Sequence, residues 1–314
     1  MNPAGALQSA LEPHGPEAAA IAQLTWVMLV GAVAVLALVT VLAALALRAP
    51  RPWLARPGAI VAGGIALPVV VLLALLVYAS IAVPRPYSAE APTVRIEVVG
   101  HQWWWEVVYL DAGGRRDFVT ANEIRIPAGR PVELRLASGD VLHSFWVPSL
   151  AGKLDLIPGR THVLRLAAQT PGLYRGQCAE YCGGPHALMG LYVLAETPER
   201  FEAWRSGQRE PAAPGPERGR ALFASLCAAC HAVRGTPAAG TLGPAPRSTP
   251  RGPDLTHVAS RVSLAAAALP NDDASRARWI AAGQHVKPGN LMPQFPGLAA
   301  EDLAALTAYL AALR

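Results

Sequence analysis

The sequence predicts a multidomain membrane protein, with a two-helix transmembrane hairpin, an all-β domain and a small all-α domain in chain order. Three observations support this fold class. Two long uncharged apolar runs lie near the N-terminus, two-residue alternation begins at Val94, and helical periodicity surrounds a Cys-x-x-Cys-His motif near the C-terminus. We expect domain limits at 1–92, 93–196, 197–216 and 217–314, of which the third is a linker.

The hairpin consists of two runs, Leu24–Leu47 and Pro57–Pro84, that contain no charged residue. At about 1.5 Å per residue, each run spans the roughly 30 Å hydrocarbon core of a bilayer. A buried helix of a large soluble protein is also apolar, but two such runs close together favour transmembrane helices at about 22–47 and 58–83. We expect Pro68 to kink the second helix.

The charges around the hairpin predict which side of the membrane each part occupies. The loop 48–56 carries three arginines, and short loops rich in Lys and Arg stay in the cytoplasm. Everything after Arg85 then lies in the periplasm or an equivalent outer compartment. Residues 1–17 are polar and are expected to form an exposed leader, with His14 solvated. The net charge of +5 is modest, and basic residues are not interleaved with aromatic residues as they are in nucleic-acid-binding proteins. No nucleic-acid partner is therefore predicted.

Alternating apolar residues predict short strands within residues 93–196. Val94–Val98, Val132–Leu136 and Val163–Ala167 have a period of two, and turns containing Gly or Pro separate them. The turns are expected at Asp111–Gly114, Pro127–Gly129, Ser138–Gly139, Pro158–Gly159 and Pro171–Gly172. Many short strands at this spacing are typical of a β-sandwich or barrel.

Residues 197–216 predict the start of a helix followed by a semi-rigid linker, because prolines recur there among charges. In the last domain, one helix leads into Cys227. The final helix runs from about Ala300 to Leu313, with leucines on one face. The Pro- and Gly-rich stretch 235–254 between them is too irregular for long elements. This indicates a small helical domain built around something other than an ordinary core.

The four cysteines form two close pairs, one Cys-x-x-x-Cys and one Cys-x-x-Cys. Two disulfides in an exported protein would be the ordinary explanation, but His and Met accompany both pairs. After Cys178 and Cys182 come His186 and Met189, and soft sulfur ligands beside imidazole suit copper as an electron carrier. A mononuclear blue-copper site uses one Cys, so the spare thiolate predicts two coppers bridged by two thiolates.

A copper pair needs a second histidine from elsewhere in the chain. The candidates are His101, His143 and His162. His143 lies at the end of an apolar strand, where a β-sandwich delivers ligands to a loop. His162 alternates with leucines and fits a structural role, and His101 precedes a run of tryptophans and fits packing around a metal ligand.

Residues 18–196 resemble subunit II of haem-copper cytochrome c oxidases. The resemblance rests on two helices ahead of a β-barrel and on four motifs, which are Gly100-His-Gln-Trp-Trp-Trp105, Asp140-Val-Leu-His143-Ser, Ile157-Pro-Gly-Arg160 and the string Cys178–Met189. It implies a cupredoxin-like fold and a dinuclear CuA centre bound by His143, Cys178, Glu180, Cys182, His186 and Met189. Glu180 would contribute its backbone carbonyl.

The same resemblance implies two further roles and one departure. The Glu180 carboxylate would face a magnesium site shared with subunit I, and Trp103 would be the exposed aromatic through which electrons enter. Many family members also carry a glutamate near the start of the second helix, at the mouth of a proton channel. Here that place falls near Val61, and no acid occurs between Arg48 and Pro84, so proton-pathway residues are not inferred.

The motif Cys227-x-x-Cys230-His231 predicts covalent attachment of a c-type haem, with His231 as an axial ligand. A thioredoxin-like redox pair is the competing interpretation, and it needs a βαβ context. The sixth ligand is expected well downstream. Met292 is the leading candidate, and His257 and His285 are the alternatives.

Residues 217–314 resemble class I cytochrome c. The motifs Gly252–His257 and Lys287–Pro293 match the domain fused to subunit II in caa-type oxidases. The two resemblances imply a subunit of the enzyme cytochrome c oxidase, with no catalytic acid or base of its own. Electrons would pass from cytochrome c or another periplasmic donor through haem c and CuA to subunit I, where O2 is reduced to water with proton pumping.

The partners implied are oxidase subunit I, subunit III and the lipid bilayer of a bacterial inner membrane. Two other functions stay open. One is the CuA-bearing subunit of a nitric oxide reductase, since substrate choice lies in the partner subunit. The other is a membrane-anchored copper chaperone, which also uses a Cys-x-x-x-Cys pair and a distant His.

Overall fold

The structure is a computed structural model that describes residues 5–48, 52–53, 56–82, 91–235 and 252–314. It divides into two compact units, one of residues 17–88 and one of residues 1–16 with 89–314. Most of the arginine-containing loop, Arg85 and most of the stretch 235–254 lie outside the described residues.

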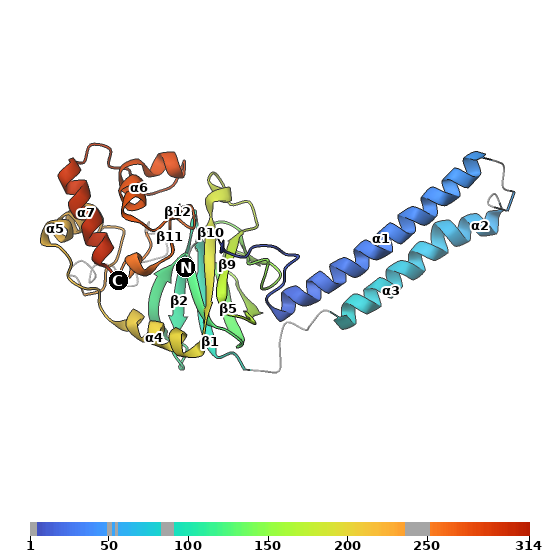
Figure 1. Ribbon diagram of the computed structural model, residues 1–314, viewed down its shortest axis with the longest axis horizontal. Helices are drawn as coiled ribbons and strands as arrows, with labels where there is room; N and C mark the ends of the chain where they lie inside the picture. Colours follow the sequence, from blue (N-terminus) through green and yellow to red (C-terminus); the bar gives the residue numbers. More distant parts are fainter. Residues whose placement is uncertain (1–4, 49–51, 54–55, 83–90, 236–251) are drawn as a thin grey trace. The chain divides into compact units, whose positions relative to one another are not determined.

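The smaller unit is a helical hairpin (Figure 1). The chain runs out along α1 (Pro16–Arg48) and returns along α2 (Pro57–Val61), η2 (Ala62–Ala66) and α3 (Leu67–Ala82). Both arms are long and apolar enough to cross a membrane, as the sequence predicts. The sequence predicts a kink at Pro68, and the structure has a π-helical turn, η2, just before this residue. Proline has no N–H to donate and its ring crowds the preceding turn, which favours such a local adjustment.

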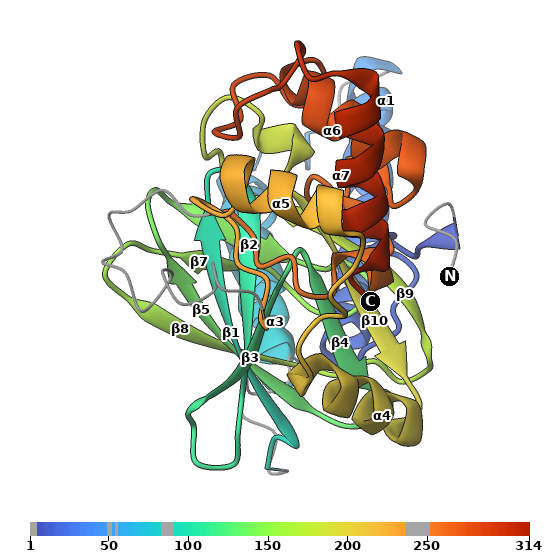
Figure 2. The same cartoon turned by 90° about the vertical axis from the view of Figure 1, so that its left-hand side faces the viewer.

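The larger unit begins with two five-stranded sheets that enclose one core, which confirms the predicted all-β, cupredoxin-like domain (Figures 1 and 2). The sheet orders are β3-β2-β1-β5-β8 and β4-β10-β9-β6-β7. The pairs β1/β5 and β4/β10 are parallel, and the other neighbours are antiparallel. The strands are β1 (Val94–His101), β2 (Trp104–Leu110), β3 (Arg116–Ala121), β4 (Glu123–Pro127), β5 (Val132–Ser138), β6 (His143–Trp146), β7 (Leu154–Leu156), β8 (Thr161–Leu166), β9 (Gly172–Cys178) and β10 (Gly190–Glu196).

The alternation in the sequence sets which residues fill this core. Ile96, Trp105, Leu134 and Phe145 are fully buried between the sheets, because successive residues of a strand point to opposite faces. Glycines with positive φ occupy three of the predicted turns, at Gly114, Gly129 and Gly159 (φ +77°, +74° and +78°). Glycine enters this left-handed region without a steric penalty.

The N-terminal residues do not form the exposed leader that the sequence predicts. Leu7 pairs with Tyr174 as an extra bridge at β9, donating to the Leu173 carbonyl and accepting from the Arg175 N–H, each at 2.9 Å. The His14 ring packs against the Tyr174 ring at 5.5 Å. The prediction was wrong because β6 pairs with β9 only at Gln177 and Cys178, so the start of β9 offers unpaired backbone groups that even a polar segment can satisfy.

The predicted linker contains a full helix, α4 (Pro198–Arg209), in place of a helix start. The carboxylate of Asp117 on β3 accepts from Arg205 at 3.2 Å and from Arg209 at 2.7 Å. Phe201 is buried in the sheet core. Phe201 and Trp204, three residues apart, lie on one face of the helix and pack against the sheet core. The prolines around the helix obscured this spacing. The four domain limits stay predictions.

The C-terminal part is helical, as predicted. Its helices are α5 (Glu217–Leu226), α6 (Asp273–Val286) and α7 (Ala300–Ala312), with a short hairpin of β11 (Ser263–Leu264) and β12 (Leu269–Pro270) between α5 and α6. α5 crosses α7 at close contact (Figure 2). Leu306 and Leu310 of α7 are buried and Leu303 packs against them, so the predicted apolar face is confirmed.

Candidate metal centre and haem cavity

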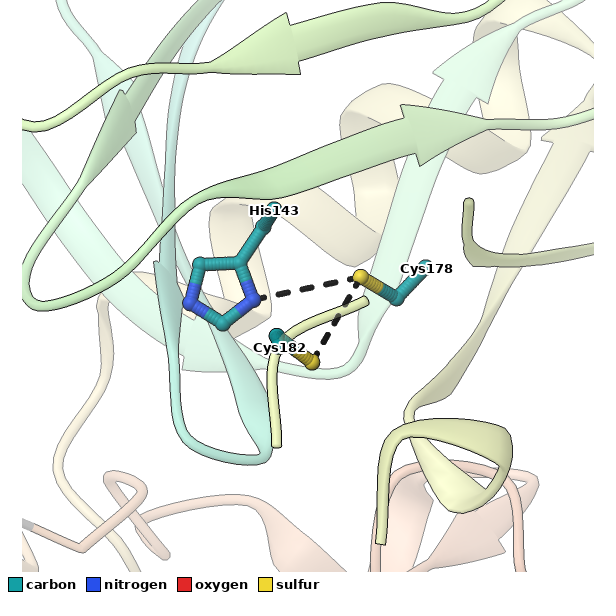
Figure 3. Close-up of side chains that lie close together, drawn as sticks. All are labelled: His143, Cys178 and Cys182. Carbon is teal, nitrogen blue, oxygen red and sulfur yellow. Dashed lines mark hydrogen bonds between the residues drawn. The ribbon is translucent and has the colours of Figure 1, made fainter. Parts of the chain in front are cut away.

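The two thiols of the first cysteine pair lie together at one end of the β-domain. Cys178 ends β9, and Cys182 lies in the loop that leads to η3 (His186–Leu188). Their sulfur atoms are 3.8 Å apart, and both residues are buried, free thiols. The ligand atoms of His143, Cys178 and Cys182 all lie within 4.8 Å of one another (Figure 3). This spacing fits a metal ion and excludes a disulfide between this pair.

His143 is the first residue of β6, the strand that pairs with β9 next to Cys178. Its Nδ1 faces Cys178 Sγ at 3.9 Å (Figure 3), and its Nε2 lies 2.7 Å from the Asp140 carboxylate. The Asp140 contact fixes the ring so that Nδ1 is the nitrogen available to a metal. At Gly100, an added Cβ would lie 2.8 Å from the His143 ring, so the glycine makes room for this ligand.

The remaining predicted ligands approach the same two sulfurs. His186 Nδ1 lies 3.4 Å and Met189 Sδ 3.8 Å from Cys182 Sγ. The backbone carbonyl of Glu180 lies 3.2 Å from Cys178 Sγ. The structure therefore brings together all six residues that the sequence assigned to copper. They surround the two thiols with imidazole, thioether and carbonyl groups, which is a soft donor set.

The two thiols differ in acidity. Burial opposes ionisation of Cys178, but contacts with His143 and hydrogen bonds from the backbone N–H groups of Ser144 and Glu180 together hold its pKa below the ordinary value. Burial, and then the neighbouring Cys178, raise the pKa of Cys182 to about 12. Cys178 is therefore the more acidic of the two thiols. Holding two thiolates requires positive charge between them, which a bound metal supplies.

The connection between β1 and β2 supports residues 178–189, which we call the copper loop. The Gln102 side chain donates to the Cys182 carbonyl at 2.7 Å, and Trp103 Nε1 donates to the same oxygen at 3.0 Å. Trp103 is half-buried. Gln102 and Asp140 lie inside motifs that the sequence singled out, but neither was identified as a supporting residue. Their positions in the sequence, close to Trp103 and His143, could have indicated this supporting role.

The two other candidate histidines lie away from the sulfurs. His101 stacks on Trp104 with ring centroids 4.7 Å apart, and its Nε2 is 3.6 Å from the Glu106 carboxylate. His162 Nδ1 lies 2.7 Å from the Asp155 carbonyl. Both therefore have packing or structural contacts, in agreement with the roles that the sequence favoured.

The second cysteine pair opens on a large apolar cavity. The cavity has a volume of about 690 Å³ and is lined by Cys227, Cys230, His231 and Met292. Its apolar lining includes Leu255, Val258, Ile280, Phe295, Leu306 and Leu310. A hydrophobic cavity of this size fits a bulky planar group, and covalent haem is the group that the motif predicts.

The surroundings of His231 favour the neutral form of its imidazole, which is the form that binds a metal. Its Nδ1 lies 2.7 Å from the Pro253 carbonyl, which leaves Nε2 unprotonated, and burial lowers its pKa below the ordinary value. Gly252 packs flat on the ring, since an added Cβ would lie 2.3 Å from it. The alternative sixth ligands do not line the cavity. His257 Nε2 bonds to the Glu210 carbonyl at 3.1 Å, and His285 is exposed.

Comparisons with known proteins agree with both sites. A family model for the periplasmic domain of cytochrome c oxidase subunit II matches residues 108–196, and a cytochrome c family model matches residues 216–314. Subunit 2 of the cytochrome c oxidase of Alkalihalophilus pseudofirmus is 39% identical over 227 residues. Residues 108–196 are therefore similar to the periplasmic domain of cytochrome c oxidase subunit II, and residues 216–314 are similar to cytochrome c.

Two further comparisons give the extent of the likeness. Subunit 2 from Bacillus sp. PS3 is 32% identical over 234 residues. The alignments cover 71% of this chain but 62% and 63% of the two curated relatives, so the chain spans about three fifths of their length. A crystal structure of the periplasmic domain of cytochrome oxidase subunit II of Bradyrhizobium japonicum is 26% identical, with a TM-score of 0.36, and covers 39% of this chain and 97% of that chain.

Proposed function

We propose that this chain is the subunit of a cytochrome c oxidase through which electrons enter, by way of a covalent haem c and a dinuclear copper (CuA) centre. The observation that carries the proposal is a pair of facing thiols 3.8 Å apart, surrounded by two imidazoles and a thioether. The haem-binding motif and its apolar cavity in the same chain support it, as do the matches to the two family models.

Cys178 and Cys182 would hold the copper pair through their thiolates, and His143 and His186 would hold it through their imidazoles. Met189 and the Glu180 carbonyl would be further, weaker ligands. When bound, a copper pair supplies a one-electron carrier of nearly constant geometry. The protein holds the imidazole of His143 through Asp140 and excludes water by burying both thiols.

The stoichiometry and the electron paramagnetic resonance spectrum of the copper-loaded full chain test this centre. We expect two coppers per chain and hyperfine splitting from an electron shared by two nuclei. A spectrum from one isolated copper would contradict the dinuclear assignment and favour a copper chaperone.

In the haem site, Cys227 and Cys230 would attach the haem through thioether bonds, and His231 and Met292 would hold its iron. Methionine and histidine ligation raises the reduction potential of a haem, which suits delivery of electrons to copper. We expect Met292→Ala to abolish the low-spin Met/His absorption spectrum of the haem. An unchanged spectrum would transfer the ligand role to His257 or His285.

The two apolar helices and the arginine loop support anchoring in a bacterial inner membrane, with both redox domains on the periplasmic side. The partners proposed are subunits I and III and a periplasmic donor such as cytochrome c. Subunit I reduces O2 to water with proton pumping and shares a magnesium site with the Glu180 carboxylate. Purification of the complex tests the substrate, since oxygen consumption supports this function and nitric oxide consumption supports a reductase.

A further inference from the structure

Lys287 is a buried lysine between the haem cavity and the copper domain. The sequence contains two lysines, Lys153 and Lys287. The side chain of Lys153 is 51% exposed, whereas Lys287 is 3% exposed. A buried polar group that has lost its water needs hydrogen-bond partners within the protein, so burial of this amine requires a specific contact.

That contact is with the residue that touches the copper loop. Lys287 Nζ donates to the Trp103 carbonyl at 2.6 Å and to the Ala265 carbonyl at 3.2 Å. Trp103 Nε1 in turn donates to the carbonyl of Cys182 at 3.0 Å. Lys287 starts the loop that leads to Met292. Two hydrogen bonds therefore connect the loop of the proposed haem ligand to a proposed copper ligand.

The residues that follow Lys287 also contact the copper loop. An added Cβ at Gly184 would lie 4.0 Å from the Pro288 carbonyl, and one at Gly289 would lie 3.8 Å from Pro185. The loop after Lys287 therefore lies directly against the copper loop. Lys287 and Trp103 also line the haem cavity together.

The β11–β12 hairpin forms a second contact with the copper domain. The Ala266 carbonyl accepts from the N–H of Gly190, the residue after Met189, at 3.0 Å. The Val262 N–H donates to the carboxylate of Glu123 at 2.6 Å. Ala265, Ala266 and Ala267 all have positive φ (55°, 61° and 63°). Alanine disfavours this conformation, and such strain persists only where the surroundings over-determine it.

We propose that Lys287 is a positioning residue that fixes the haem domain on the copper domain at Trp103 and so sets the rate of electron transfer between the two centres. The proposal rests on the proposed function and deepens it. Trp103 is then covered by the chain's own haem domain, and an external donor delivers its electron to the haem domain instead of to Trp103.

Lysine acylation of the full, metal-loaded chain tests the burial directly. With an N-hydroxysuccinimide ester as the probe and peptide mass spectrometry as the readout, Lys153 should react at least tenfold faster than Lys287. Equal labelling of the two lysines would overturn the proposal, and this measurement needs no variant.

The variant Lys287→Met tests the coupling, with Lys153→Met as the matched control. In full-length holoprotein we expect the rate of intramolecular haem-to-copper electron transfer after photoreduction to fall at least tenfold in Lys287→Met alone. Hydrogen exchange at the Gly190 and Val262 amides should accelerate, while the copper resonance and the haem absorption spectrum stay unchanged. An unchanged rate with both spectra intact would overturn the positioning role. Missing copper or haem spectra in the unaltered chain would instead refute the proposed function.

Discussion

The copper loop (residues 178–189, with His143) and the haem cavity differ in how much of each site the protein builds by itself. In the copper loop, each of the six ligand residues has a donor atom within 4 Å of one of the two sulfurs. The haem cavity instead leaves about 690 Å³ to be filled between residues of the helical domain and residues of the β-domain such as Glu97 and Trp104. A loop between two paired strands can therefore be preformed, whereas the helical domain completes the burial of its apolar side chains only with the haem in place.

The largest expected effect comes from removing the haem. Without haem, the apolar side chains that line the cavity would face water. Burial of one such side chain typically contributes about 1.5–3 kcal/mol, so the combined loss is comparable with the about 5–15 kcal/mol of a typical domain. We expect the double variant Cys227→Ser/Cys230→Ser to unfold residues 217–314 and leave the β-domain folded. Limited proteolysis with mass mapping measures this, and removal of copper by a chelator is the control that leaves both domains resistant. A protease-resistant helical domain in the double variant would contradict the expected dependence of this domain on haem.

A second effect concerns the contact between these two regions. Burial raises the pKa of Glu123 to about 7. The folded state therefore binds a proton more tightly than the unfolded state, and stability falls as pH rises from about 4.5 to about 7. Above that range, Glu123→Gln should stabilise the protein by up to about 3 kcal/mol, since Gln still accepts from the Val262 N–H. Thermal unfolding at pH 4 and pH 8 measures the difference. A stabilisation that is equal at both pH values would contradict the assignment.

A smaller effect is expected from the residue that orients His143. Asp140→Asn keeps the shape of the side chain but weakens its hold on the imidazole, and loss of such a supporting contact typically lowers metal affinity about 10–100-fold. Competition titration with a copper chelator measures the change. Asp155→Asn is the matched control, because the Asp155 carboxylate faces solvent and Lys153. Equal affinities for the two variants would mean that the copper loop does not depend on Asp140.

The smallest effect separates the candidate histidines. His162→Gln should leave the copper content unchanged and cost about 1 kcal/mol of stability, since it alters one hydrogen bond to the Asp155 carbonyl. His143→Gln should lose copper while the β-domain stays folded. Metal analysis and chemical denaturation measure both quantities. Copper loss in the His162 variant would reassign the second imidazole.

The sequence alone was sufficient where ligands are local. The spacing from Cys178 to Met189 and from Cys227 to His231 predicts both sites, because a turn of fixed length brings such residues together wherever the chain goes. Alternation and apolar periodicity likewise predicted the two sheets, the hairpin and the final helix. These patterns report which face of an element is buried.

Tertiary structure alone decided the contacts between distant segments. It brought His143 to the two thiols, put Asp140 behind its ring, and turned the expected leader into an extra bridge at β9. It also joined Lys287 to Trp103, 184 residues apart. Local patterns set the periodicity of burial, but not which buried group meets which. The register of strand pairing and the packing of one domain on another choose those partners, and neither is encoded within a short window of sequence.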